Sequence, residues 1–417
     1  MVLAGTARAQ MWLDNRQYNE GPGIWLTDGL VLHPGIGLEG GYDTNPLHRS
    51  TDVIGSPLIQ IGPYIDLATE PPQRKIEGEE VVAEPPVVDF RWGVAGTWDY
   101  FFSSNSEIKK QSDIGVDTTL NLELFPRGSW TLILFDNYVR TLESFETASE
   151  VGFNNDNNVG QLSVRFTPGG RAMEFQLGYA NHLYYFEAGS LGYGNHMGHE
   201  VMFDYKWKFF PKTAFLFKAR FEPITYSENY NSDSMPLRTW AGLQGLFTDK
   251  FGMLILLGYG NGFYDKGPNF NSFIGRVEAD YFIGTFSSFK IGIMRDFVDS
   301  IWANYYDKIG GYIRYNHLLI QALLLAAEVG VYYQDYANTP LTEVRDNRTL
   351  TYSSTGRSDV SVEGGLLIEY RVLDWLAFNV SGKYTSDFTD FSVTSMDQTR
   401  KMSFQKFEVL GGARFSY

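Results

Sequence analysis

The chain has 417 residues and a formal net charge of −15, and it contains no cysteine. The absence of cysteine excludes a disulfide scaffold and thiol chemistry, and the acidic balance argues against a nucleic-acid partner, because phosphate binding needs a basic surface. Aromatic residues make up 16% of the chain and glycine occurs 43 times, which favours strands over helices. No window offers the roughly 20 apolar residues of a membrane helix, but barrel strands bury only alternate residues in lipid.

The N-terminal region carries the features of an exported protein. Residues 1–9, MVLAGTARA, end in a small-x-small sequence of the form that signal peptidase cleaves. We interpret them as the remnant of a secretion signal, with a chance match to the cleavage motif as the alternative. Residues 10–30 carry Trp12, Trp25 and Leu26 among glycine and polar residues, and they predict a periplasmic segment, a plug or a partly ordered tail. Residues 31–417 form the main domain.

Within residues 31–417, segments of about ten to fourteen residues alternate apolar with polar, as strands with two different faces do. Clear examples are residues 200–209, 276–283, 362–371 and 406–417. The apolar faces are repeatedly aromatic near the strand ends. This is the arrangement of the aromatic girdles at the two membrane interfaces.

The connections between these segments fall into two alternating sets. Tight turns are predicted at residues 125–129, 167–170, 210–212, 248–250, 284–287, 316–317 and 373–374, and long polar loops at residues 43–56, 103–112, 143–158, 187–198, 227–237, 265–269, 299–303, 338–357 and 386–402. Such sorting puts all tight turns at one end of a closed antiparallel sheet. We therefore predict an all-β fold, a transmembrane antiparallel up-and-down β-barrel of about 18 strands. It has short periplasmic turns, long extracellular loops and both termini in the periplasm.

One periplasmic connection, residues 67–86, is long, acidic and rich in proline. A connection of this length is uncommon unless it is functional. We expect it to dock a basic surface of a periplasmic partner, with a tolerated insertion as the alternative, since loop length costs little free energy. The docking candidates are its acidic residues, Glu70, Glu77, Glu79, Glu80 and Glu84.

Charged residues recur on the face of the strands opposite the apolar one. Barrels of 16 to 18 strands enclose water, so such side chains stay hydrated. Because their charges have mixed sign, they either only keep the wall hydrated, without selectivity, or form a specific path for ions. A lumen of mixed sign suits neutral or weakly charged solutes such as sugars. The candidates for lining the lumen are Arg165, Glu174, Asp204, Lys206, Lys218, Arg220, Arg276, Glu278, Asp280, Arg314, Glu363, Glu369, Arg371 and Arg414. Asp117, Glu123, Glu222, Lys208 and Lys383 share the pattern.

The sequence offers little catalytic or metal-binding chemistry. His196 and His199 form an H-x-x-H pair followed by Glu200, but zinc sites with this spacing lie on helices, and glycines surround the pair in a predicted loop. No phosphate-binding or dinucleotide motif occurs. We therefore predict no catalytic residue, no metal site and no cofactor, and a protein that is not an enzyme.

The two ends of the barrel resemble known outer-membrane proteins. The closing segment FEVLGGARFSY resembles the C-terminal sorting signal of outer-membrane barrels, with Phe415 and Tyr417 as its aromatic residues. The segment LHPGIGLEGGYDTNP, residues 32–46, resembles the first strand of the β-barrel porins associated with exopolysaccharide clusters. This resemblance implies a channel for polysaccharide export in the outer membrane of a Gram-negative bacterium. The implied partners are outer-membrane lipid, the barrel assembly machinery and a periplasmic polysaccharide-export component.

Two further functions fit the same pattern. A general diffusion porin often folds one long loop into the pore, and residues 338–357 are long enough to do so. A structural outer-membrane subunit of a motility or adhesion complex would instead have a closed lumen.

Overall fold

The computed structural model describes residues 21–27, 29–69, 87–142, 154–284, 287–337, 342–345, 348–352, 356–395 and 398–417. The proposed signal remnant and the docking candidates Glu70, Glu77, Glu79, Glu80 and Glu84 lie outside these residues. None of the described helices is long and apolar enough to span a bilayer.

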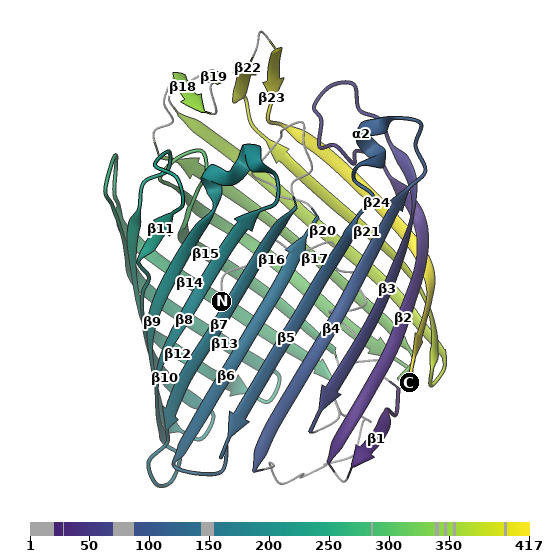
Figure 1. Ribbon diagram of the computed structural model, residues 1–417. Helices are drawn as coiled ribbons and strands as arrows, with labels where there is room; N and C mark the ends of the chain where they lie inside the picture. Colours follow the sequence, from purple (N-terminus) through teal and green to yellow (C-terminus); the bar gives the residue numbers. More distant parts are fainter. Residues whose placement is uncertain are drawn as a thin grey trace.

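In the described part of the chain, eighteen strands close into one antiparallel barrel, because β2 pairs with the last strand, β24 (Figure 1). This confirms the predicted fold and strand number. Two short strands belong to the same sheet: β1 (Ile24–Thr27), which pairs with β2, and β11 (Ile224–Tyr226), which continues the line of β10. The strands of the wall are β2 (Leu30–Asp43), β3 (Ser56–Ala68), β4 (Val88–Phe101), β5 (Ile114–Leu124), β6 (Trp130–Thr141), β7 (Asn155–Phe166), β8 (Met173–Phe186), β9 (His196–Phe210), β10 (Thr213–Phe221), β12 (Ser234–Thr248), β13 (Phe251–Tyr264), β14 (Phe270–Gly284), β15 (Ser287–Asp299), β16 (Tyr305–Leu319), β17 (Leu323–Tyr336), β20 (Arg357–Leu373), β21 (Leu376–Phe388) and β24 (Phe404–Ser416).

Alternation along each strand sorts side chains between the two faces of the wall. In β24, Arg414 and Ser416 are 1% and 5% exposed, whereas Phe415 and the following Tyr417 are 37% and 52% exposed. Because side chains alternate with a period of two, the register of the strand decides which residues face inward. A shift of one residue would put the arginine outside and the aromatic rings inside.

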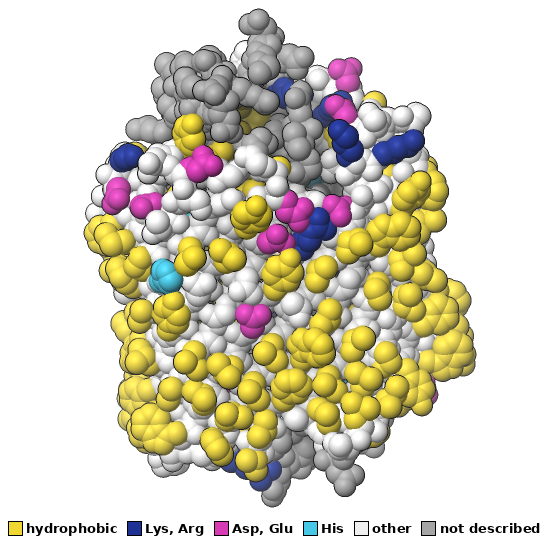
Figure 2. Space-filling view, in the orientation of Figure 1, with side chains coloured by type: hydrophobic (Ala, Val, Ile, Leu, Met, Phe, Trp, Pro, Cys, Tyr) yellow, Lys and Arg dark blue, Asp and Glu magenta, His cyan; other side chains and the backbone are white. Residues whose placement is uncertain are grey.

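The outer surface of the barrel is a broad apolar belt, and charged side chains gather above it (Figure 2). Large aromatic side chains are exposed at the ends of the strands, for example Trp130, Phe210, Tyr42 and Phe388. A closed barrel with such a belt satisfies every backbone group internally and presents apolar side chains to lipid. Single-chain barrels with an even number of strands belong to the bacterial outer membrane, so this chain is an outer-membrane β-barrel.

One carboxylate interrupts the belt. Asp136 lies midway along β6 and has the same strand parity as the outward-facing Trp130 and Leu134. The side-chain amide of Asn158, on the neighbouring strand β7, donates a hydrogen bond of 3.1 Å to its Oδ2. This bond satisfies only part of the carboxylate, and charge on the lipid face destabilises a barrel.

Apart from the long connection between β3 and β4, the connections are short at the lower end of the barrel in Figure 1 and longer at the upper end, which is the sorting that the sequence predicted. One predicted turn was wrong. Residues 316–317 lie inside β16, and the chain reverses at residues 320–322 instead. Ile320 and Gln321 take φ values of 45° and 59° there. Such values are unfavourable for a β-branched residue, so the pairing of Leu319 with Leu323 outweighs the turn preference of Asn316.

Two long outer loops form structure of their own. β18 (Thr342–Arg345) and β19 (Arg348–Tyr352) pair with β22 (Ser392–Ser395) and β23 (Gln398–Lys401) in a separate four-stranded sheet. This sheet stands above the wall (Figure 1). The described part of the loop 338–357 therefore lies above the barrel.

Within the residues that the structure describes, two short helices lie in the outer loops. α2 (Ser106–Lys109) begins after Asn105, whose side chain accepts hydrogen bonds from the backbone N–H groups of the first turn. This is the usual capping arrangement. Its Ile108 is buried against Leu58, Phe101 and Leu410, which anchors the loop to the wall. The 3-10 helix η2 (Gly189–Gly194) follows β8.

Candidate functional site: the inner wall and the outer mouth

The inner wall carries the charged residues that the sequence singled out. Each has the strand parity opposite to the exposed apolar residues of its own strand, as Arg276 and Glu278 do beside Phe273 and Tyr281 in β14. The same holds for Arg165, Glu174, Asp204, Lys206, Lys218, Arg220, Asp280, Arg314, Glu363, Glu369, Arg371 and Arg414. Their role in conducting a solute stays a prediction.

The wall from β7 to β17 is lined by partly hydrated ion pairs. Arg220 contacts Asp204 at 2.7 Å, and Arg314 contacts Glu328 at 3.5 Å. These side chains are 20% to 55% exposed. Arg165 of β7 makes a similar pair with Glu123 of β5, with the two side chains 25% and 19% exposed. Because cations and anions alternate, this wall presents water with mixed charge and no single sign.

The wall formed by β20, β21, β24 and β2 to β4 is different, because many of its inward polar groups are buried. Arg414 forms a bidentate pair with Glu369, with Nη2–Oε1 at 2.7 Å and Nε–Oε2 at 3.1 Å, and both side chains are at most 2% exposed. Lys406 contacts Asp43 at 2.9 Å under similar burial. Charges this deeply buried do not meet a passing solute, so the water-exposed ion pairs described above lie on the β7 to β17 side, and Glu363 of β20 is exposed as well.

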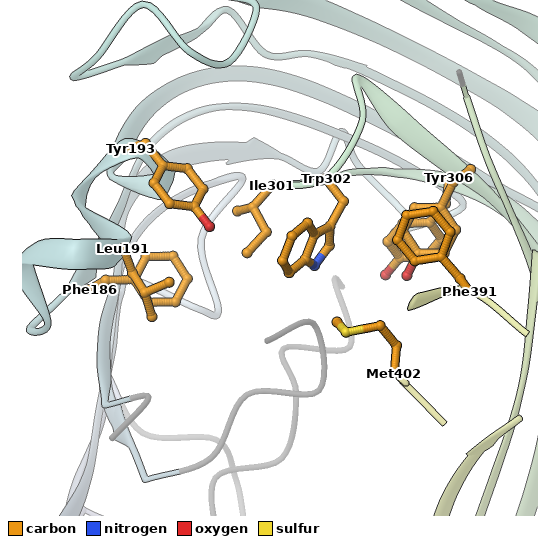
Figure 3. Packing of buried hydrophobic residues seen from close by; sticks show 9 residues of the cluster. Phe186, Leu191, Tyr193, Ile301, Trp302, Tyr306, Phe391 and Met402 are labelled. Carbon is orange, nitrogen blue, oxygen red and sulfur yellow. The ribbon is translucent and has the colours of Figure 1, made fainter. Parts of the chain in front are cut away.

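An apolar cluster, here called the mouth bridge, crosses the outer end of the barrel (Figure 3). Its members lie in β8 and η2, in the loop before β16, in β16 and β17, and in the loop between β21 and β24. β9, β10, β12, β13, β14 and β15 separate β8 from β16 around the wall, so these elements face each other across the mouth. The mouth bridge consists of Phe186, Leu191, Tyr193, Ile301, Trp302, Tyr306, Tyr336, Phe391 and Met402, all 2% to 9% exposed.

The loop from Ser300 to Asn304 provides the centre of the mouth bridge. Ile301 reaches Gly194 of η2 so closely that a Cβ on this glycine would come within 3.1 Å of the isoleucine side chain. The backbone N–H of Trp302 donates to the Ser300 hydroxyl at 3.1 Å, which fixes the start of the loop. On the far side, the guanidinium of Arg357 lies 4.4 Å from the ring centre of Tyr336, a favourable cation–π distance. The mouth bridge therefore packs apolar side chains across the entrance.

A charged cluster joins the outer ends of β5, β6 and β8. Arg140 contacts Glu187 through Nε at 2.5 Å and Asp113 through Nη1 at 3.1 Å. The hydrogen bonds from Arg140 lower the pKa of Glu187 below its ordinary value, against the opposing effect of burial. Burial alone would raise the pKa of Asp113, but hydrogen bonds from Arg140, the Ile114 backbone and Asn154 outweigh it and lower this pKa too.

The H-x-x-H pair of the sequence does not form a site. The expected loop ends at Asn195, and His196 and His199 both belong to β9. Three residues apart on a strand, they point to opposite faces. His199 is exposed on the outer face beside Tyr179, whose hydroxyl lies 2.7 Å from its Nδ1.

A different histidine meets two carboxylates on the inner wall. In the described residues, His182, Glu200 and Glu222 are the one group whose ligand atoms all lie within 4.8 Å of one another. Sequence reasoning missed this group because its members come from β8, β9 and the residue after β10. Their meeting depends on strand register, which aligns His182 with Gly198, two residues before Glu200.

No family model matches the chain, and no curated protein matches it. Solved barrels of Pseudomonas aeruginosa are similar in structure. OccK1 (OpdK) is 10% identical, with 93% of this chain and 99% of that chain covered and a TM-score of 0.47. OccK11 (OpdR) is 8% identical over 95% and 100%, also at 0.47. OccK2 (OpdF), solved in complex with glucuronate, is 9% identical over 92% and 97%, at 0.47.

Proposed function

We propose that this chain is a diffusion porin, a channel that admits small polar solutes across the outer membrane. The observation that carries the proposal is the partly hydrated, mixed-charge wall from β7 to β17 inside a closed barrel of eighteen strands. Charges such as Arg314 and Glu328 remain 46% and 55% exposed. Water fills a barrel of this size, and a wall of alternating sign attracts neither anions nor cations strongly.

The mouth bridge supports small solutes over a polysaccharide. Polysaccharide export needs a continuous wide path at the outer end, whereas Trp302 and its neighbours pack across that end with at most 9% exposure. We therefore favour the porin over the export channel that the resemblance of residues 32–46 implied.

Solute entry into liposomes tests this function. Purified full-length protein is reconstituted, and swelling rates are measured with arabinose, glucose, sucrose, raffinose and a dextran. We expect rates that fall steeply with solute size and no entry of dextran. Equal rates for raffinose and arabinose would contradict a narrowed mouth, and no swelling with any sugar would contradict a diffusion porin.

A substitution in the mouth bridge tests its role directly. We expect Trp302→Ala to raise single-channel conductance and to admit larger sugars, because it removes the side chain at the centre of the bridge. Trp375→Ala is the matched control, since Trp375 is 46% exposed and stacks on Phe415 of the outer face. If Trp302→Ala leaves the conductance unchanged, or if Trp375→Ala raises it equally, then the mouth bridge does not limit conduction.

A further inference from the structure

We propose that His182, Glu200 and Glu222 form a binding site for a divalent transition-metal ion on the inner wall. One imidazole nitrogen and two carboxylate oxygens are the donors that zinc, manganese and iron(II) accept in proteins. With three protein ligands, the ion keeps open positions for water or a solute in the lumen. This inference does not depend on the proposed porin function.

One ligand atom from each of the three residues lies within 4.8 Å of the others. His182 Nε2 lies 3.5 Å from Glu200 Oε2, and His182 Nδ1 lies 3.6 Å from Glu222 Oε1. Ligands bound at about 2.0–2.2 Å stand roughly 3–3.5 Å apart around a metal. Because a metal binds one nitrogen of the ring, Glu200 already stands at this spacing from Nε2, and Glu222 must move toward the same nitrogen to close the site. His182 Nε2 is buried and has no hydrogen-bond partner in the part of the chain that the structure describes. It is therefore free to bind a ligand.

Each carboxylate presents one oxygen to His182 and the other to an arginine. Arg220 Nε contacts Glu200 Oε1 at 3.1 Å, and Arg238 Nη1 lies 4.0 Å from Glu222 Oε2. The oxygens nearest the histidine are the remaining ones, Glu200 Oε2 and Glu222 Oε1. Outer contacts of this kind orient metal ligands. The two arginines thus hold the carboxylates in position without occupying the site.

The local charge does not oppose a cation. Arg220 also contacts Asp204, and Arg238 also contacts Asp296. The four carboxylates around the two guanidinium groups therefore outnumber them. Lys218, 3.7 Å from Asp204, adds one further positive charge, so a divalent ion still enters a group with excess negative charge.

Gly198 provides the space for the site. It pairs with His182 across the strands β8 and β9, and a Cβ at this position would lie 2.8 Å from Glu222 Oε1 and 3.4 Å from the Cβ of His182. Only a residue without a side chain leaves both groups room to approach each other. Gly198→Ala should therefore displace Glu222 and weaken the site without removing a ligand.

Metal titration of the intact barrel tests the proposal. Full-length protein in detergent is stripped with EDTA and titrated with cobalt(II), followed by its visible absorption, and with zinc by calorimetry. We expect one ion per chain. We expect His182→Ala and Glu222→Gln to weaken affinity by at least 100-fold, beyond the roughly 10–100-fold effect of an outer-contact substitution. Gly198→Ala should have an intermediate effect.

The matched control is His199→Ala, which removes a neighbouring histidine from the outer face of β9 and should leave affinity unchanged. Circular dichroism and heat-modifiable gel mobility confirm that each variant remains a folded barrel. The proposal is overturned if the wild-type protein binds no stoichiometric ion, if folded His182→Ala binds as tightly as wild type, or if His199→Ala abolishes binding.

Discussion

Replacing Arg414 with methionine should destabilise the barrel more than any change on the hydrated wall. Arg414 belongs to the last strand, and its bidentate contact reaches across β21 to Glu369 of β20. Its Nη1 also donates to the Ser416 hydroxyl at 3.0 Å. Methionine has a similar length and no charge, so the substitution removes the bidentate contact of the buried Glu369.

The expected size follows from that burial. Removing one partner of a buried ion pair costs about 3–5 kcal/mol, because the remaining charge loses its compensation and cannot return to water. Replacing both partners by apolar groups of similar volume is often neutral or stabilising, by about 1–4 kcal/mol. We therefore expect Arg414→Met and Glu369→Leu each to be strongly destabilising, and the double variant to be more stable than either.

Equilibrium unfolding of the detergent-solubilised barrel in guanidinium chloride measures these differences, with tryptophan fluorescence as the signal. Arg314→Met is the control, because Arg314 is 46% exposed and its pair with Glu328 is hydrated. It should cost less than about 1 kcal/mol. A loss below about 1 kcal/mol for Arg414→Met, or a double variant that equals the sum of the single ones, would refute the reasoning, since a buried pair must show coupling.

Three further predictions concern the outer wall, the outer loops and the last residue. Asp136→Leu should raise the unfolding free energy, measured as above, because it removes a carboxylate from the apolar belt; a loss of stability would mean that Asp136 does not face lipid. Its contact with Arg140 lowers the pKa of Glu187 below the ordinary value of 4.5. This contact therefore stabilises the loops fully at pH values above 4.5, and the stabilisation is lost as the pH falls from 4.5 through the lowered pKa. Limited proteolysis of the outer loops should therefore accelerate below about pH 4 in wild type, and Glu187→Gln should be cut faster already at pH 7. Deleting Tyr417 should lower the amount of assembled barrel in outer-membrane fractions, and wild-type amounts would argue against a sorting role.

The fold was predictable from the sequence because two independent signals agree. Alternation gave each strand an apolar and a charged face, as in β24, where Arg414 and Phe415 separate as expected. The sorting of connections then gave the closed antiparallel order. Both signals are local and repeat along the whole chain, so single errors, such as the turn placed at residues 316–317, did not change the result.

The site was less predictable because it depends on contacts between distant strands. Nothing in the sequence near residues 299–303 shows that Ile301 and Trp302 would pack on η2 at the other side of the mouth. The loop 338–357 looked better suited to narrowing the pore because it is longer. Likewise, His182 and Glu222 carry no local motif, and they meet only through the registers of β8 with β9 and of β9 with β10 and β11.

The two halves of the inner wall explain how one barrel holds its shape and still encloses water. A cylinder without a packed core has few interior contacts to resist flattening. Here the buried pairs Arg414–Glu369 and Lys406–Asp43 connect the last strands to their neighbours near the point where the barrel closes, between β24 and β2. The opposite wall is relieved of that task, and its charges stay hydrated. The buried pairs that stabilise the barrel and the hydrated pairs thus lie on different strands. For this reason a charged side chain that faces inward has two different roles: Arg414 stabilises the closure of the barrel, and Arg314 contacts the water of the lumen.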